Sequence, residues 1–296
     1  MNNSHLDIFA ISDIGCRRKN NEDAVLAVPR RGCVVISDGM GGGKAGEVAS
    51  TMLIDRVEKL LRQAPKIPGE QETAIIRSSY EVNTEIQDFA SAHGYTAMGA
   101  TVVCLLFNCW NPDSATIFHA GDSRCYRVRN GEIERLTTDH TLAAAAKEKG
   151  KELPPNLAGV LTNALGTGCD FFLARTTIEV EVGDCFVLCS DGLYTMVNDD
   201  EILSTCLLNS QEDSEVIGRL LLKQALENGG RDNVSIVVVK VLREGIKVTP
   251  TQEELAQETQ AQLRNLNELA DTPPTAVQPV PTTETQWRSV ISKAHE

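Results

Sequence analysis

Short apolar runs rich in β-branched and aromatic residues recur along the chain, and turn-forming residues bound them, which predicts β-strands. One stretch, CYRVRNGEIERL, reads as a hairpin that turns at Asn130-Gly131. We expect antiparallel sheets from this pattern. The other predicted strands are LDIFAIS, GCVVIS, ATVVCLLF, ATIFHA, TTIEVEV, CFVLC and VSIVVVKVL.

Helical patterns occur in two pairs. Apolar residues at three- and four-residue spacing run through 48–61 and 75–89, and Pro65 and Pro68 separate these two segments. The second pair covers 199–209 and 214–228. Strands and helices thus form segregated groups, which favours helices on the outer faces of stacked sheets over an alternating βαβ fold.

In two stretches the apolar residues do not recur at a regular spacing. Residues 141–168 carry a Pro-Pro break and are predicted to form an irregular insertion with one short helix, of the kind that often covers a site. From Leu242 the composition shifts to Glu, Gln, Thr and Pro, which bury too little apolar surface to order firmly. We therefore predict one domain over 1–242 and a polar, flexible tail over 243–296, with a tether, a docking segment or a helix as alternatives.

The composition excludes some classes of partner. With 28 basic and 41 acidic residues the net charge is -13, which repels nucleic-acid phosphates and anionic lipids. Most of the nine cysteines lie in apolar runs without a CxxC pair, as in a reduced cytosol. No stretch reaches the ~18 apolar residues of a membrane span. We expect a cytoplasmic protein that binds neither nucleic acid nor membrane.

Acidic residues stand at the ends of the strongest predicted strands. GCVVISDGMG and DCFVLCSDGLY repeat one arrangement, an apolar strand followed by Ser-Asp-Gly, and they place Asp38 and Asp191 where a buried strand emerges. ATIFHA leads into Gly-Asp-Ser-Arg at Asp122, and Asp232 directly precedes VSIVVVKV. Four carboxylates therefore flank four predicted core strands.

Each Asp-Gly pair alone is ordinary turn chemistry. If the strands lie together in stacked sheets, however, their ends converge on one edge, and clustered carboxylates there repel unless protons or cations neutralise them. Hard divalent metals with oxygen ligands relieve that repulsion. Gly39 lacks a side chain, so its carbonyl could approach such a cation closely.

The glycine-rich run from Gly41 to Gly46 offers two alternatives. GGGKAG matches GxGxxG after a strand, but a second helix follows where a dinucleotide fold needs a second strand ending in an acid. The Walker pattern fails because Lys44 is followed by Ala45. Neither nucleotide motif is supported.

The acids at the strand ends belong to a longer series of segments, which follow one another along the chain in this order: RRKNNEDA, VISDGMGG, GATVV, HAGDSRCYRV, LTTDHT, LTNALG, LCSDGLY and GGRDNVSIVVV. In this series the chain resembles the protein phosphatase 2C family, the PPM-type metal-dependent Ser/Thr phosphatases, in its compact bacterial form. The resemblance spans nearly everything between Leu6 and Val241. It implies an α+β fold, a four-layer α-β-β-α sandwich with two central antiparallel sheets and the metals at one edge.

The resemblance also implies roles for individual residues. Asp38 corresponds to the carboxylate that bridges two Mn²⁺ or Mg²⁺ ions, Gly39 to a carbonyl ligand, and Asp191 and Asp232 to ligands of the second ion. Asp122 corresponds to a ligand of a third ion, although pairing with Arg124 in its own turn is an alternative. Arg18 corresponds to the arginine that holds the substrate phosphate, or else belongs to an ordinary basic turn. Glu22 and Asp23 correspond to acids that bind metal-coordinated waters.

The implied activity is hydrolysis of phosphoserine and phosphothreonine in proteins by a metal-activated water, opposing a Ser/Thr kinase. Many eukaryotic relatives carry a histidine two residues after the bridging aspartate, but Met40 stands there, so the leaving group must be protonated by another donor. His119 and His140 receive no role. The rival hypothesis is a catalytically silent phosphoprotein-binding module of the same fold, which would be expected to lack metal-binding acids.

Overall fold

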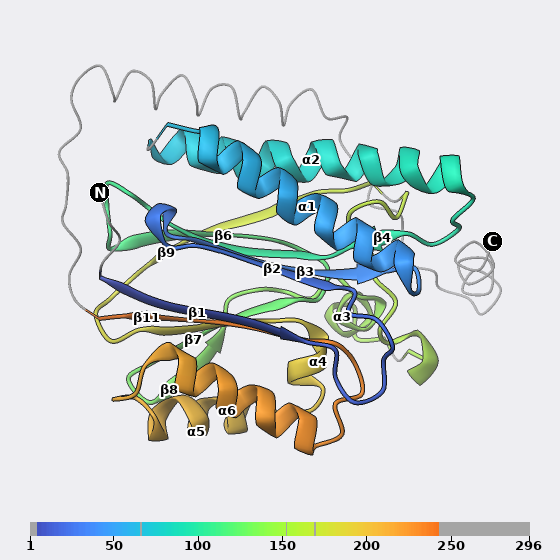
Figure 1. The fold of residues 1–296 in the computed structure, drawn as a ribbon. Helices are drawn as coiled ribbons and strands as arrows, with labels where there is room; N and C mark the ends of the chain where they lie inside the picture. The colour runs from blue at the N-terminus through green and yellow to red at the C-terminus, as the bar shows by residue number, and fades with distance from the viewer. Residues whose placement is uncertain (1–4, 66, 152, 169, 243–296) are drawn as a thin grey trace.

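Two antiparallel sheets lie face to face in the computed structural model, which describes residues 5–65, 67–151, 153–168 and 170–242 (Figure 1). One sheet has the order β1-β11-β10-β7-β8 and the other β2-β3-β5-β6-β9, with the short β4 paired to β3. The strands are β1 (Leu6–Asp13), β2 (Asp23–Val28), β3 (Cys33–Met40), β4 (Gly99–Ala100), β5 (Val102–Phe107), β6 (Ser114–Ala120), β7 (Arg124–Arg129), β8 (Glu132–Arg135), β9 (Ala174–Glu179), β10 (Cys185–Cys189) and β11 (Val234–Val241).

Helices cover the outer face of each sheet (Figure 1). The sheet that contains β3 carries α1 (Lys44–Gln63) and α2 (Pro68–His93). The sheet that contains β11 carries α4 (Asp191–Tyr194), α5 (Asp199–Leu208) and α6 (Ser214–Glu227). This is the predicted four-layer α-β-β-α sandwich.

Three apolar clusters hold the layers together, one between the sheets and one under each helical layer. In β3, Cys33 and Val35 face the helices, whereas Val34 and Ile36 face the other sheet. Successive side chains in a strand point to opposite faces. Because both faces of β3 are buried, its sequence is an unbroken apolar run.

The predicted helices are all present, and polar side chains cap three of them, including the short helix of the insertion described below. The Asn198 side chain accepts from the Glu201 N–H while the Glu201 carboxylate accepts from the Asn198 N–H, a capping box that begins α5. Asp213 caps α6 by accepting from the Val216 N–H. The hairpin is also confirmed, since Asn130 and Gly131 both adopt the positive φ angles of a tight turn between β7 and β8.

The strand β2 was not predicted. Its sequence, DAVLAV, includes two alanines and a leucine among its six residues, so it lacks the dense β-branched composition of the other strands. Tertiary pairing decides its conformation, because it lies along the edge of β3 over its full length.

The predicted insertion contains one short α-helix, α3 (Leu142–Glu148), and a 3₁₀ turn, η2 (Pro155–Leu157). Its far end is attached to the sheet, because Ala100 and Leu165 exchange N–H to carbonyl bonds of 3.0 and 2.9 Å. The predicted tail, 243–296, lies outside the described residues, and the boundary at 242 stays a prediction. Within the described part of the chain, no helix is long and apolar enough to cross a membrane.

Candidate active site

Asp23 and Asp38 are cross-strand partners in β2 and β3. The Asp38 N–H donates to Thr101 Oγ1 (2.9 Å), and the Thr101 N–H donates to the Asp38 carbonyl (2.8 Å). Ser190 Oγ donates to Asp23 Oδ2 at 2.7 Å across the gap between the sheets. Because Ser190 directly precedes Asp191, this bond brings acids from both sheets to one edge.

Asp191 and Asp232 are brought together by a close backbone contact. A Cβ atom on Gly192 would lie 1.9 Å from the Asn233 carbonyl oxygen, so only glycine permits this approach. The Ser190 N–H also donates to the Ser235 carbonyl at 3.1 Å. The start of α4 and the start of β11 are therefore held side by side.

Asp122 follows β6 and reaches the same edge. Its negative charge lies close enough to Asp191 to raise the pKa of that carboxyl. The alternative in which Arg124 pairs with it is wrong, because Arg124 donates instead to Asp139, with Nε at 3.0 Å from Oδ1 and Nη2 at 2.7 Å from Oδ2. Asp122 is thus not held by the arginine of its own turn.

These carboxylates raise one another's pKa values. Burial raises the pKa of Asp38 well above its ordinary value, and the negative charges of Asp23, Asp191, Asp122 and Asp232 add to the shift. Burial, with Asp122 and Asp232 nearby, raises the pKa of Asp191 to about 7. Burial also raises the pKa values of Asp23 and Asp122 to about 6. Such a set of repelling oxygen ligands suits hard divalent cations.

In this structure the four aspartates Asp38, Asp122, Asp191 and Asp232 are not arranged as a metal coordination sphere. No three Asp, Glu, His or Cys side chains within the described ranges have the spacing of a metal-binding group. Arg18 contributes to this arrangement, because its Nη2 donates to Asp232 Oδ2 at 2.5 Å. A metal site built from these residues therefore requires side-chain movement, including exchange of the Arg18 contact on Asp232.

The Glu22 carboxylate is directed at the start of α1. Its Oε1 accepts from the Gly43 N–H at 2.7 Å, where the helix dipole favours a negative charge. Its carbonyl accepts from the Gly39 N–H (3.1 Å) and from Ser50 Oγ (2.6 Å). These contacts fix the segment that follows Arg18 against β3 and α1.

Gly39 has a packing reason to lack a side chain. A Cβ atom there would lie 2.0 Å from the Gly46 carbonyl oxygen in α1 and 2.6 Å from the Glu22 carbonyl oxygen. The close approach of α1 to β3 thus requires this glycine, whatever its carbonyl binds.

Asn233 is a site residue that the sequence analysis missed. Its Oδ1 accepts from the Glu22 N–H (2.8 Å), while its Nδ2 donates to the carbonyls of Ile14 (3.0 Å) and Asn20 (2.9 Å). The loop that carries Arg18 is thereby tied to the start of β11. Its position directly after Asp232 was the only available signal.

His119 and His140 stack with ring centroids 4.9 Å apart beside the Asp122 turn. His140 Nδ1 accepts from the Gly121 N–H (3.2 Å) and lies 3.1 Å from Asn163 Nδ2. Burial lowers the pKa of His140 to about 4. His140 thus joins the turn to the insertion as a neutral ring.

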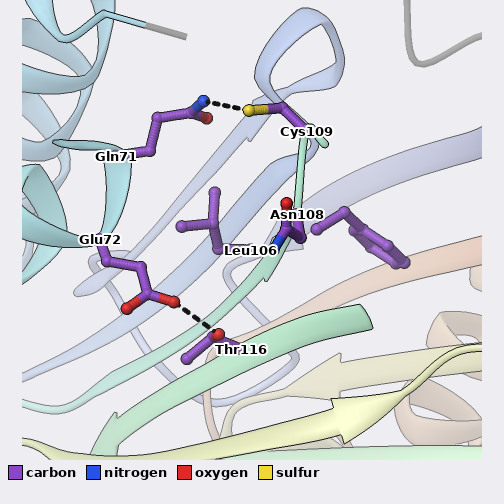
Figure 2. A pocket seen from close by; sticks show the side chains of 7 residues that line it. Gln71, Glu72, Leu106, Asn108, Cys109 and Thr116 are labelled. Atoms are coloured by element: carbon purple, nitrogen blue, oxygen red, sulfur yellow. Dashed lines mark hydrogen bonds between the residues drawn. The ribbon is translucent and has the colours of Figure 1, made fainter. Parts of the chain in front are cut away.

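Two cavities of the described part of the chain lie away from the clustered acids. One cavity has a volume of about 10 Å³. At its wall Gln71 Nε2 donates to Cys109 Sγ (3.2 Å) and Thr116 Oγ1 donates to Glu72 Oε1 (2.8 Å) (Figure 2). This cavity has room for about one water molecule. A groove of about 480 Å³ lies between α5 and α6. Neither contains any of the clustered acids.

Known proteins share this arrangement of sequence and fold. The family model described as Protein phosphatase 2C matches residues 17–227. The serine/threonine protein phosphatase PstP of Mycobacterium tuberculosis is 33% identical over 240 residues, which are 79% of this chain and 44% of PstP. The chain thus spans less than half the length of that relative.

Solved structures agree in fold. PppA, described as a key regulatory component of T6SS in Pseudomonas aeruginosa, superposes with a TM-score of 0.73 and 32% identity over 81% of this chain and 99% of that one. The catalytic domain of PstP in complex with two manganese ions gives a TM-score of 0.68 and 31% identity over 80% of this chain and 99% of that one. On its sequence and its fold, the chain belongs to the protein phosphatase 2C family.

Proposed function

We propose that the protein is a metal-dependent serine/threonine phosphatase that hydrolyses phosphoserine and phosphothreonine in proteins. The observation that carries the proposal is the convergence of Asp38, Asp122, Asp191 and Asp232 on one edge, where each of the first three has a raised pKa. The manganese ions of the related PstP domain support the same chemistry.

In this proposal Asp38, the Gly39 carbonyl, Asp191 and Asp232 hold two Mn²⁺ or Mg²⁺ ions, and Asp122 with Asp191 holds a third. Divalent cations, when bound, activate a water for attack on phosphorus and neutralise charge on the phosphoryl oxygens. The chain's own contribution is to bring these carboxylates to one edge of the two sheets, where short side-chain movements would let them bind the ions before the substrate arrives.

Arg18 binds the substrate phosphate in this proposal. A guanidinium fork suits two phosphate oxygens, and the Arg18 side chain is half exposed at the edge of the acid cluster. Asp23 is held by Ser190, and Glu22 by the Gly43 N–H, and in this proposal both acids accept hydrogen bonds from waters bound to the metal ions. Met40 carries no transferable proton, so the leaving group takes its proton from another donor.

The proposed substrates are phosphorylated proteins in a signalling pathway of the cytoplasm, where the enzyme opposes a Ser/Thr kinase. The catalytic unit would be 1–242. The rival hypothesis, a silent phosphoprotein-binding module, is disfavoured because all four proposed metal acids are present.

A phosphothreonine peptide tests the proposal. We expect the full-length protein to release phosphate with Mn²⁺ or Mg²⁺ and to stop in chelator, and Asp38→Asn and Asp191→Asn to lose at least about a hundredfold in turnover. Asp55→Asn, an exposed change on α1, is the matched control and should keep wild-type turnover. Turnover that survives chelation would refute the metal mechanism, and no turnover on several phosphopeptides would favour the binding module.

A further inference from the structure

The groove of about 480 Å³ lies between α5 and α6, in the outer layer of one half of the sandwich (Figure 1). Thr205 and Gln224 join the two helices within it, since Gln224 Nε2 donates to Thr205 Oγ1 at 3.0 Å. Leu208 lines the groove at the end of α5 and is 85% exposed. A large apolar side chain beside a groove offers a contact point for a second apolar surface.

The opposite end of the groove is acidic. Asn228 Nδ2 donates to the Met196 carbonyl at 2.8 Å, so the end of α6 lies beside the start of α5. Asp200, Glu201 and Glu227 line the groove, and among the described residues no lysine or arginine lines it. A ligand for this surface should therefore carry an apolar group at one end and positive charge at the other.

The chain leaves the described residues next to the apolar end of this groove. Lys240, close to the end of β11, donates through Nζ to the carbonyls of Ser210, at 2.9 Å, and Glu212. Ser210 follows Leu208 by two residues, and Leu242, the last described residue, follows Lys240 by two. The continuing chain is therefore attached close to Leu208.

One stretch of that continuing chain matches the groove in chemistry. It is TQWRSVISKAH, residues 285–295, which carries Arg288 and Lys293 and no acidic residue. Its apolar residues recur at the three- and four-residue spacing of one helix face: Trp287, Val290, Ile291 and Ala294. This is the pattern of a short basic amphipathic helix, which can bind in a groove through its apolar face.

A second stretch fits less well. Leucines also recur over 253–271, but five acidic residues and one arginine give that stretch a net negative charge, which the acids of the groove would repel. Distance does not prevent residues 285–295 from reaching the groove. At about 3.3–3.6 Å per extended residue, residues 243–286 can span the whole domain.

We infer that the groove between α5 and α6 binds residues 285–295 of the same chain, with Trp287 against Leu208 and Lys293 toward Glu227. The six residues from Trp287 to Lys293 would rise about 9 Å as a helix, which suits a groove that follows α5 from its end to its start. Attachment to the same chain raises the local concentration of the stretch and favours its binding. This inference does not depend on the proposed phosphatase activity.

Tryptophan fluorescence of the full-length protein tests the inference. The chain has two tryptophans, so Trp110→Phe leaves Trp287 as the only reporter, and acrylamide quenching measures how far water reaches it. We expect a shielded Trp287. Leu208→Gln should lower the docking constant about tenfold, so that quenching rises toward that of a free 285–295 peptide. Val182→Gln is the matched control, because Val182 is 53% exposed but does not line the groove.

A charge exchange tests the direction of binding. Glu227→Lys and Lys293→Glu should each raise the quenching of Trp287, and the double variant should restore part of the shielding. Thermal melting checks that each variant is folded. The inference is overturned if wild-type Trp287 is quenched like the free peptide, if Leu208→Gln changes quenching no more than Val182→Gln, or if the double variant restores nothing. Shielding that grows with protein concentration would assign the groove to a second copy and would also overturn it.

Discussion

Arg18 Nη2 donates to Asp232 Oδ2 at 2.5 Å, although the two residues are 214 positions apart. The hydrogen bond to Asp232 raises the pKa of Arg18, with smaller contributions from Glu22 and Asp191, so the guanidinium stays charged. The same cation thus faces a proposed metal ligand and the proposed phosphate position. Metal and phosphate binding should therefore respond in opposite directions when it is removed.

Arg18→Ala should raise the KM for a phosphopeptide about ten- to hundredfold, since hydrogen bonds to a charged group contribute about 1.5–3 kcal/mol. Mn²⁺ binding should become no weaker, because Asp232 loses a competing partner. Arg17→Ala, at the exposed neighbouring position, is the control and should change neither value. Peptide kinetics and Mn²⁺ calorimetry measure the two effects. Weaker Mn²⁺ binding in Arg18→Ala would contradict the competition.

His140 should make the fold sensitive to acid. Burial, with the stacked His119 adding to the effect, lowers its pKa from 6.5 to about 4, while the charge of Asp139 acts more weakly in the opposite direction. His140 Nδ1 faces two donors, the Gly121 N–H and Asn163 Nδ2. Between these pH values the unfolded chain binds more protons than the folded one. The free energy of unfolding should therefore fall as pH drops from about 6.5 toward 4.

His140→Gln keeps a hydrogen-bond acceptor but does not titrate, so its free energy of unfolding should fall less steeply over that window. Urea titrations at pH 7.5 and pH 5 measure the difference, with His93→Gln on the exposed face of α2 as the control. Comparing variant with wild type cancels the opposite pH dependence of the clustered carboxylates. An unchanged pH slope in His140→Gln would show that the ring is not held neutral by burial.

The acids at the strand ends could be predicted because they follow a local signal, an apolar strand that ends in Ser-Asp-Gly. Asp38 and Asp191 carry that signal twice, and the two sheets do bring them to one edge. The contacts that arrange the edge carry no such signal. Asn233 reaches Glu22, Ile14 and Asn20 across more than 200 positions, and such pairs depend on the register of β1 against β11.

Strand pairing also explains the two other points at which the structure differs from the sequence prediction, the strand β2 and the partner of Arg124. DAVLAV becomes the strand β2 because β3 offers it an edge, not because of its own propensity. Arg124 pairs with Asp139 and not with Asp122, because β8 runs antiparallel to β7 and the chain that follows β8 places Asp139 beside the arginine. The local sequence pattern predicts which polar residues lie at strand ends, but the pairing of the strands determines which of these residues contact one another.

Gly192→Ala should separate Asp191 from Asp232. The backbone angle at Gly192 is one that alanine adopts, so the conflict is steric: the new Cβ would lie 1.9 Å from a main-chain oxygen of Asn233, which cannot rotate away. Forcing an extra methyl into a packed site destabilises by about 1–3 kcal/mol. Because the displaced segments carry two proposed ligands, Mn²⁺ affinity and turnover should fall by more than this loss of stability explains.

Gly159→Ala is the matched control, because a Cβ there meets nothing within 4 Å, and its free energy of unfolding should stay within about 0.5 kcal/mol of wild type. Urea unfolding in chelator gives the stability of each variant, and Mn²⁺ calorimetry gives the affinity at a temperature where both are folded. If Gly192→Ala binds Mn²⁺ as tightly as Gly159→Ala, the contact between Gly192 and Asn233 does not set the distance between the two acids, and the loop after α6 must adjust without moving Asp232.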